Sequence, residues 1–378
     1  MTDNAPADLL LLGAGHAHVH VLEKLARLPR AQRARWQVTL VSPHPVALYS
    51  NMLPGFVAGH YDADDCTMGL HRLIENSGVR HLSARAMHID AAARSVQVYG
   101  TASGQAELGY RLLSIDTGGV MDRARLEASI PGITAHGHFL RPIESFVAEW
   151  QRIQNQIGTE PRQLAVVGGG AGGVELALAL RHRLPDCGVQ LVTGGGPPMA
   201  SHPAGVQRRV VAALARHGIT VHPLACTGLT ADSLRLSDDS THPCDVALVA
   251  VGAQAPRWLA RSGLTLDGRG FLAVNAYQQS LGHPEVFAAG DVSSRVDGAY
   301  PRNGAYAAHA GPPLATNLLA AMDGKPMTLY TPPPHVLNLF ACGEQRAIAS
   351  WGRWYWEAEW LWRWKDRLDR DFVARFGH

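Results

Sequence analysis

Two glycine-rich loops carry the residue types best suited to chemistry in this sequence, because bare backbone amides can bind phosphate. The first reads Gly13-Ala-Gly15-His16-Ala-His18, and the second reads Gly168-Gly-Gly170-Ala-Gly172-Gly173. Each loop follows a short apolar run and precedes a helical pattern. A strand that ends in glycines and opens a helix presents amides at the positive end of the helix dipole, where a diphosphate binds. Both loops therefore predict dinucleotide binding, with structural glycine turns as the alternative.

The first loop departs from the usual pattern, since His18 stands where a third glycine normally allows close packing of helix on strand. We expect His16 and His18 to be neutral, because the positive end of a helix disfavours imidazolium, and one of them to contact the phosphate. Only His16 and His20 share a helical face, and no carboxylate or thiol is near them in the sequence. We therefore assign no metal site.

The acid that usually ends the second strand of such a unit and binds the ribose hydroxyls is missing from both units. Ser42 takes its place in the first unit and Thr193 in the second. The sequence therefore leaves open the choice between NADH and NADPH. Arg208 and Arg209 could meet a 2′-phosphate or could be ordinary surface residues. A second loop that has lost its nucleotide is a further alternative.

Two repeated strand–turn–helix–strand units must position these loops. Apolar runs predict buried strands at 8–12 and 36–41 around one helix, and at 164–167 and 189–192 around another. Each pair forms a βαβ unit with a right-handed crossover. A helix over 304–321 is expected to be interrupted at Gly311-Pro312-Pro313. The predicted fold class is α/β, with two Rossmann-like dinucleotide-binding domains and a C-terminal segment of strand and amphipathic helix.

The composition narrows the class of protein. The 378 residues are 46% hydrophobic and carry a net charge of +2, which argues against binding of nucleic acid through charge. The 5 cysteines lack metal-type or disulfide-type spacing, which favours a reducing compartment. No apolar run is long enough to span a membrane, and residues 1–8 do not look like a signal peptide. We expect a cytoplasmic protein.

Further motifs fall in the order found in a known family. Asp116-Thr117-Gly118, the Val251-Gly252 turn and Val286-Phe-Ala-Ala-Gly290-Asp291 lie at the expected places relative to the two loops. In these motifs the chain resembles the pyridine nucleotide–disulfide oxidoreductase superfamily, whose members are flavoproteins with two dinucleotide-binding domains. The resemblance implies FAD on the first loop and NAD(P)H on the second, with Asp291 on the ribityl chain. It also implies that a helix beginning near Arg302 points its N-terminus at the flavin, where it would stabilise the negative charge of the reduced ring.

The resemblance implies a domain division and a set of contact residues. The FAD-binding domain would comprise residues 1–135 and 256–332, with the NAD(P)-binding domain at 136–255. Residues 333–378 would form a C-terminal segment that packs on the protein or lies at a membrane interface. The loops and the resemblance together assign cofactor contacts to Gly13, Gly15, His16, His18, Ser42, Tyr49, Met52, Leu53, Pro54, Ala86, Thr117, Gly118, Gly168, Gly170, Gly172, Gly173, Thr193, Gly252, Gly290, Asp291, Arg302, Gly304 and Ala305.

A closer resemblance comes from Tyr49-Ser-Asn-Met-Leu-Pro54, Tyr300-Pro-Arg302 and the tryptophan-rich tail. These segments are similar to the type II NADH dehydrogenase-like group that is fused to, or associated with, selenide, water dikinase. By this resemblance residues 49–54 line the flavin. Glu175 matches the acid near the nicotinamide in type II NADH dehydrogenases and is the candidate catalytic residue, with a plain helix-surface acid as the alternative.

The cysteine pair that classical family members carry beside the flavin is absent, so the acceptor would meet the flavin directly. The resemblance implies that NAD(P)H reduces FAD and that FAD then reduces a non-disulfide acceptor such as a quinone. One alternative is a flavin-bearing binding or regulatory partner in selenium metabolism. Another is a sulfide or selenide:quinone-type oxidoreductase that uses Cys342, although its partner cysteine is missing. We interpret all 5 cysteines as structural.

Aromatic residues gather near the C-terminus. Apolar side chains recur every four residues, so on a helix each step overshoots a turn by about 40° and the stripe winds slowly. This pattern predicts packing on the protein itself, a homodimer, or peripheral contact with the inner face of a membrane. The residues of the stripe are Trp356, Trp360, Trp364, Leu368, Phe372 and Phe376.

Overall fold

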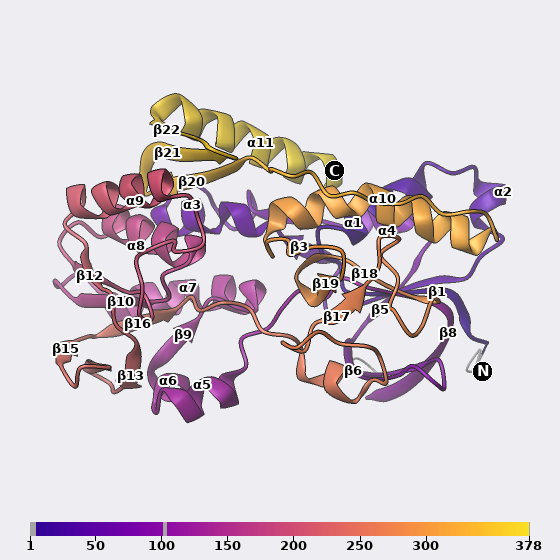
Figure 1. Cartoon of the computed structure of the whole chain (residues 1–378), viewed down its shortest axis with the longest axis horizontal. Coiled ribbons are helices and arrows are strands. Elements are labelled where there is room, and N and C mark those ends of the chain that lie inside the picture. The colour runs from indigo at the N-terminus through magenta and orange to yellow at the C-terminus, as the bar shows by residue number, and fades with distance from the viewer. Residues whose placement is uncertain (1–4, 101–103, 378) are drawn as a thin grey trace.

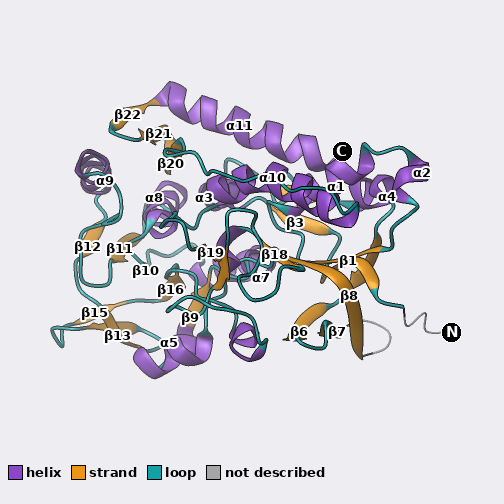
Figure 2. Cartoon of the chain, turned by 45° about the vertical axis from the view of Figure 1, so that its right-hand side comes forward, coloured by secondary structure: helices purple, strands orange, loops and turns teal. Residues whose placement is uncertain are grey.

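The computed structural model describes residues 5–100 and 104–377. Two mainly parallel sheets lie side by side along the long axis of the molecule, each with helices packed against it (Figure 1). A long C-terminal helix, α11 (Glu359–Gly377), runs from a small antiparallel sheet beside one half toward α1 and α10 of the other half (Figure 1, Figure 2). The C-terminal segment therefore bridges the two halves.

The first sheet is built around β1, whose four leucines are fully buried because both faces of the strand are covered. Leu9 and Leu11 pack toward α1 and α10, and Leu10 and Leu12 pack toward the β6–β7 side. The strand order is β5 (Arg80–Ser83), β2 (Val38–Ser42), β1 (Ala7–Leu12), β8 (Gln105–Ile115), β7 (Ser95–Tyr99) and β6 (Arg85–Asp90), with β18 (Val286–Ala288) paired to β8. The helices of this half are α1 (His18–Ala26), α2 (Arg30–Arg33), η1 (Ser50–Met52), α4 (His71–Ser77) and α10 (Gly304–Met322), whereas α3 (Leu53–Ala58) packs into the core of the other half.

The second sheet is entirely parallel, and its central strand leads directly into the second glycine loop. Its order is β12 (Thr220–His222), β11 (Gly188–Val192), β10 (Gln163–Val167), β16 (Val246–Val249) and β9 (Gly137–Phe139). Its helices are α5 (Arg123–Ser129), α6 (Ile133–His136), α7 (Ile143–Ile157), α8 (Ala171–Arg183) and α9 (Ala204–Arg216). The chain leaves the first sheet after β8 and returns to it with β18. The division at residues 135, 255 and 332 stays a prediction.

Short antiparallel and bridging elements complete the fold. A meander of β13 (Cys226–Leu229), β14 (Ser233–Leu236) and β15 (Thr241–Pro243) extends the second half. The first half carries the pairs β3 (Val46–Leu48) with β4 (Thr67–Gly69) and β17 (Leu272–Val274) with β19 (Ser293–Arg295), and the turns η2 (Arg257–Arg261) and η3 (Gly290–Val292). The C-terminal segment contains β20 (Asn338–Cys342), β21 (Glu344–Trp351), β22 (Trp354–Ala358) and α11.

The predicted interruption of the 304–321 helix is wrong. Helix α10 continues without a break through Pro312 and Pro313. Leu314 and Leu318 are fully buried in the core that α10 shares with α1, and Gly311 lets His20 of α1 approach closely. Tertiary packing therefore outweighs the loss of two helical amide donors.

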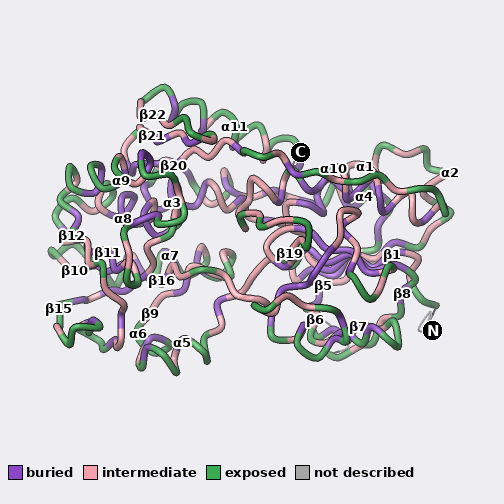
Figure 3. The backbone as a smooth tube through the Cα atoms, viewed as in Figure 1, coloured by how far each residue is buried: buried purple, intermediate pink, exposed green. Residues whose placement is uncertain are grey.

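The aromatic stripe is also not one continuous helical face. Trp356 lies in strand β22, because α11 begins only at Glu359. Within α11, Trp360 and Trp364 are exposed whereas Phe376 is fully buried, so the stripe winds from solvent into the core along the helix. Figure 3 shows exposed and buried stretches next to each other along α11. This winding is what a four-residue spacing produces on a helix of 3.6 residues per turn.

Candidate functional site

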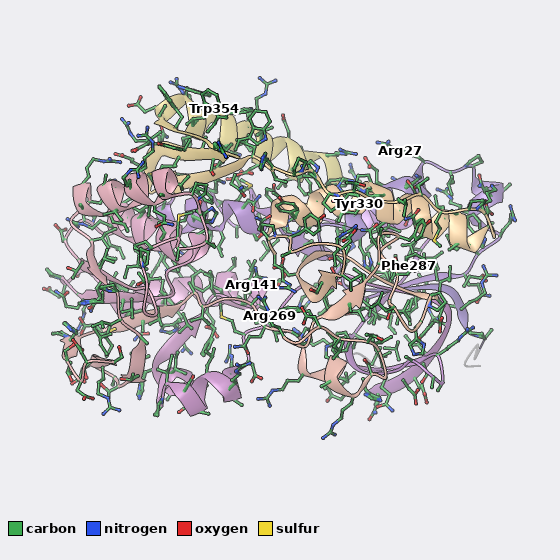
Figure 4. The ribbon with its side chains drawn as sticks, viewed as in Figure 1. Arg27, Arg141, Arg269, Phe287, Tyr330 and Trp354 are labelled. Carbon is green, nitrogen blue, oxygen red and sulfur yellow. The ribbon has the colours of Figure 1, made fainter. Side chains whose placement is uncertain are left out.

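A cavity of about 1540 Å³ lies between the two halves of the molecule. Its wall combines the glycine loop after β10, the N-terminal turns of α8 and α10, residues 49–51, 53 and 54, and one face of α11. Arg141 and Arg269, which both line it, lie where the halves face each other (Figure 4). Ligands of open α/β sheets bind at the carboxyl ends of the strands, so this is the expected place for a site.

The second glycine loop leaves the start of α8 open to the cavity. A side chain at Gly170 would meet no other atom within 4 Å, so a ligand can approach the backbone closely. A Cβ at Gly173 would instead lie 1.9 Å from the Gly168 carbonyl oxygen, so this glycine allows α8 to pack on β10. The amides at this helix start therefore fit a diphosphate. The cavity-lining residues of this half include Gly168, Gly170, Gly172, Thr193 and Gly252.

The opposite wall contains several residues assigned to the flavin. The Asn303 side chain accepts from the Tyr306 amide at 3.0 Å, which caps α10 with its positive end toward the cavity. Arg141 donates to Asp291 Oδ2 at 3.4 Å, which holds this carboxylate at the cavity edge. The assigned residues in this wall are Tyr49, Leu53, Pro54, Asp291, Arg302, Gly304 and Ala305.

The first glycine loop lies outside the wall of this cavity. The amides of Ala17 and His18 at the start of α1 donate to Asp116 Oδ2 at 2.8 and 2.9 Å. His18 Nδ1 lies 2.6 Å from the Gly13 carbonyl oxygen and therefore donates to it, so in the neutral ring Nε2 accepts from Ser114. Burial lowers the pKa of both His16 and His18, in agreement with the predicted neutral state.

The remaining assigned residues are not brought into the cavity wall. Met52 is fully buried in the first core, and Ser42 Oγ donates to the His44 carbonyl oxygen. Ala86 lies in β6, Thr117 is exposed, and Gly290 lines a smaller neighbouring cavity. Cofactor contacts of these residues and of Gly118 stay predictions.

Glu175 of α8 lies in the cavity wall and accepts a hydrogen bond from the Ala341 amide at 2.8 Å. Burial raises the pKa of this carboxyl to about 7, although the nearby Lys365 ammonium opposes the shift. Near neutral pH the group therefore exists in both protonation states. This is the property of a group that can hold or release a proton.

A buried ion pair from α11 faces the same cavity and was missed by sequence reasoning. The Lys365 ammonium donates to the Asp369 carboxylate and, at 2.7 Å, to the Asn51 carbonyl oxygen. The Tyr49 hydroxyl donates to Asp369, and the Tyr49 ring stacks on Phe372 with centroids 4.6 Å apart. The sequence did contain a sign of this ion pair: Lys365 is one of few lysines in an arginine-rich chain, and Asp369 follows four residues later, at helical spacing.

The cysteines offer no redox pair beside the cavity. All 5 are free and buried, and Cys226 is the one cysteine in the cavity wall among the described residues. Cys342 is fully buried, and burial raises the pKa of its thiol to about 12, so the reactive thiolate is scarce at neutral pH.

The second glycine loop and the N-terminus of α10 face one cavity between two Rossmann-like halves, with no cysteine pair beside it among the described residues. This arrangement is typical of a dinucleotide-dependent oxidoreductase. A comparison with protein families agrees with this class. The chain belongs to the pyridine nucleotide-disulphide oxidoreductase family, whose model matches residues 7–317. It is accordingly an NAD(P)H-dependent flavin oxidoreductase with FAD and NAD(P)H as cofactors.

A curated relative is similar over most of the chain, and solved structures share the fold. The chain is 26% identical over 360 residues to demethylphylloquinone reductase NdbB of Synechocystis, covering 93% of this chain and 88% of the relative. Its fold matches the sulfide:quinone oxidoreductase of Aquifex aeolicus with a TM-score of 0.78 at 17% identity, covering 97% and 91% of the two chains. It matches NDH2 of Plasmodium falciparum with a TM-score of 0.76 at 13% identity, covering 98% and 97%.

The residues present fit the two cofactors where the cavity is open. The start of α8 offers bare amides for the diphosphate of NAD(P)H, and the start of α10 offers a positive helix end for a flavin ring. Among the described residues, no helix is both long and apolar enough to cross a membrane.

Proposed function

We propose that this protein oxidises NAD(P)H and reduces a quinone, both within the cavity between its two halves. One observation carries the proposal: the α8 glycine loop, the α10 N-terminus, Glu175 and Lys365 all line the same cavity, which has room for a nucleotide, a flavin and an acceptor. The likeness to a demethylphylloquinone reductase over most of both chains supports a quinone as the acceptor.

The chain's own residues would orient the reactants and manage charge. The amides at the start of α8 would hold the nucleotide diphosphate, and Asp291 would bind the ribityl hydroxyls. When FAD is bound, it supplies the redox chemistry: it can accept a hydride and pass the electrons on. The N-terminus of α10 would stabilise the negative charge of a reduced flavin ring near its amides.

Quinone reduction also requires protons, and Glu175 is suited to supply one. Its carboxyl lies in the cavity wall and has a pKa of about 7, so it can give up a proton and regain it near neutral pH. Lys365 lies close enough to favour the carboxylate that this leaves behind. Glu175 is therefore the proposed catalytic residue.

Anaerobic titration of the purified holoprotein tests the proposal. NADH or NADPH should bleach the visible flavin absorbance, and a water-soluble quinone should restore it within one turnover. In separate titrations, ferredoxin replaces the quinone as acceptor, and sulfide replaces the nucleotide as donor. Bleaching that only ferredoxin reverses would contradict a quinone acceptor, and a flavin that neither nucleotide reduces would contradict the function as a whole.

We further propose that the protein approaches a membrane through a tryptophan surface, defined by Trp351, Trp354, Trp356, Trp360 and Trp364. All five side chains are at least 41% exposed, and Trp354 reaches 79%. Leu368, one helical turn beyond Trp364, is exposed and also lines the cavity. The surface is therefore continuous with the cavity mouth, which suits an apolar acceptor that arrives from a bilayer.

The relation to the group associated with selenide, water dikinase stays a proposal. Two of the segments that carry this resemblance reach the cavity wall, at Tyr49 and Arg302. They would contact a flavin in this group and equally in other type II NADH dehydrogenases. Sulfide or selenide chemistry through Cys342 is disfavoured by the full burial of that thiol and its position outside the cavity wall.

A further inference from the structure

The chain places one of its own carboxylates beside the backbone amides at the first glycine loop. Asp116 follows the last residue of β8, next to the end of β1, and is only 4% exposed. Its Oδ2 accepts from the amides of Ala17 and His18, the first free donors of α1. The carboxylate thus occupies part of the anion-binding end of this helix.

Two glycines pack tightly around the Asp116 side chain. A Cβ at Gly15 would lie 2.6 Å from Asp116 Cγ, and a Cβ at Gly290 would lie 2.8 Å from Asp116 Oδ1. These two glycines belong to the two motifs that the sequence assigned to FAD. The room that they create beside α1 is therefore filled, at least in part, by Asp116.

Donors nevertheless remain for a ligand beside the carboxylate. Among the described residues, the amides of Gly15 and His16 have no hydrogen bond acceptor. The buried Nε2 atom of His16 also has no partner, and it faces the start of α10, 3.6 Å from where a Cβ of Gly304 would lie. An unpartnered buried nitrogen between the two helix starts points to a ligand with hydrogen-bonding atoms.

We propose that Asp116 sets the affinity of the first loop for a dinucleotide diphosphate by acting as a resident anion. The inference rests on the proposed function, because it takes FAD as the ligand of this loop. A diphosphate on the amides of Gly15 and His16 would lie next to a buried carboxylate, and the two like charges repel strongly where water is excluded. Asp116 also uses helix-end donors that a diphosphate would otherwise share. Removing the charge while keeping an acceptor should strengthen binding of the diphosphate.

The test compares Asp116→Asn with the wild type in titrations of the deflavinated full-length protein with FAD, FMN and riboflavin. The asparagine oxygen still accepts from the α1 amides, so the helix cap is kept. We expect the Kd for FAD to fall roughly tenfold, the order expected for one partly screened charge. The Kd for riboflavin, which carries no phosphate, should change little. Asp122→Asn is the control, because the Asp122 side chain also accepts from a helix-start amide, in α5, away from the first loop.

The outcomes separate this inference from the proposed function. An unchanged or weaker affinity of Asp116→Asn for FAD, with a wild type that binds FAD, would overturn the inference alone. An equal gain for riboflavin would also overturn it, since the effect would then not depend on phosphate charge. A wild type that binds no FAD at all would overturn both. Asp116→Ser, which offers a neutral hydroxyl acceptor, provides the same comparison if the asparagine variant does not fold.

Discussion

At the residue scale, Glu175 links the stability of the protein to pH. Burial raises the pKa of this carboxyl from 4.5 to about 7, so between these values the folded state binds a proton that the unfolded state has released. Its contribution to stability is therefore present at low pH and is lost as pH rises through about 7. Glu175→Gln should be more stable than the wild type at pH 8, by about 3 kcal/mol, and about equally stable near pH 4.5.

Thermal unfolding of both proteins from pH 5 to 8 measures this difference. The glutamine oxygen can still accept from Ala341, so the variant should change the charge and little else. Glu149→Gln, on an exposed position of α7, is the matched control for the loss of a carboxylate. A Tm difference for Glu175→Gln that does not grow with pH would show that Glu175 does not carry a raised pKa.

At the element scale, α11 is held against the first half by a buried ion pair. The side chains of Lys365 and Asp369 are each only 7% exposed, and Lys365 also binds the carbonyl of Asn51. Lys365→Met should lower stability by about 3–5 kcal/mol, because it leaves Asp369 as an unpaired buried charge. The double variant Lys365→Met/Asp369→Leu should recover most of this loss. A double-mutant cycle from denaturant unfolding tests this, and additive losses would contradict the pairing.

The sequence predicted the elements that local patterns determine. Both βαβ units are present, and α8 lies between β10 and β11 as expected, because its apolar run and its glycine start are both local signals. The break at Pro312 was wrong, since the contact between α10 and α1 is not visible in the local sequence. The same holds for Trp356, whose placement in β22 follows from its pairing with β21.

Some residues of the candidate site could likewise be predicted from local sequence, and others only from the fold. Cavity-lining glycines such as Gly170 follow from their position between strand and helix, and Tyr49 follows from the family resemblance. Lys365 lies more than 300 residues from its partner Asn51 in the sequence, so only the folded chain shows that Lys365 and Asp369 line the cavity. Asp116 was noted as part of a motif, but its role as an internal cap of α1 required the register of β8 beside β1.

At the scale of the whole molecule, α11 connects the cavity to the outer surface. One face carries Lys365 and Asp369 into the cavity wall, while Trp360 and Trp364 stack on each other at 6.2 Å and face outward. A soluble surface rarely exposes so many large aromatic side chains together, which marks the patch as an interaction site. Exposed Arg363 on the same helix adds positive charge, which favours an anionic lipid surface, whereas Arg367 is paired with Asp371 at 3.8 Å.

Flotation with anionic phospholipid vesicles tests the tryptophan surface. The wild type should rise with the vesicles, and Trp354→Ser/Trp360→Ser/Trp364→Ser should reduce the bound fraction about tenfold or more, since each indole loses its apolar burial in the interface. Reduction of a soluble quinone should be unchanged, because none of these three residues lines the cavity. Leu329→Ser/Val296→Ser removes exposed apolar side chains elsewhere and should float normally. A wild type that stays unbound and sediments as a dimer, which the triple variant dissociates, would show that the surface joins two copies of the chain.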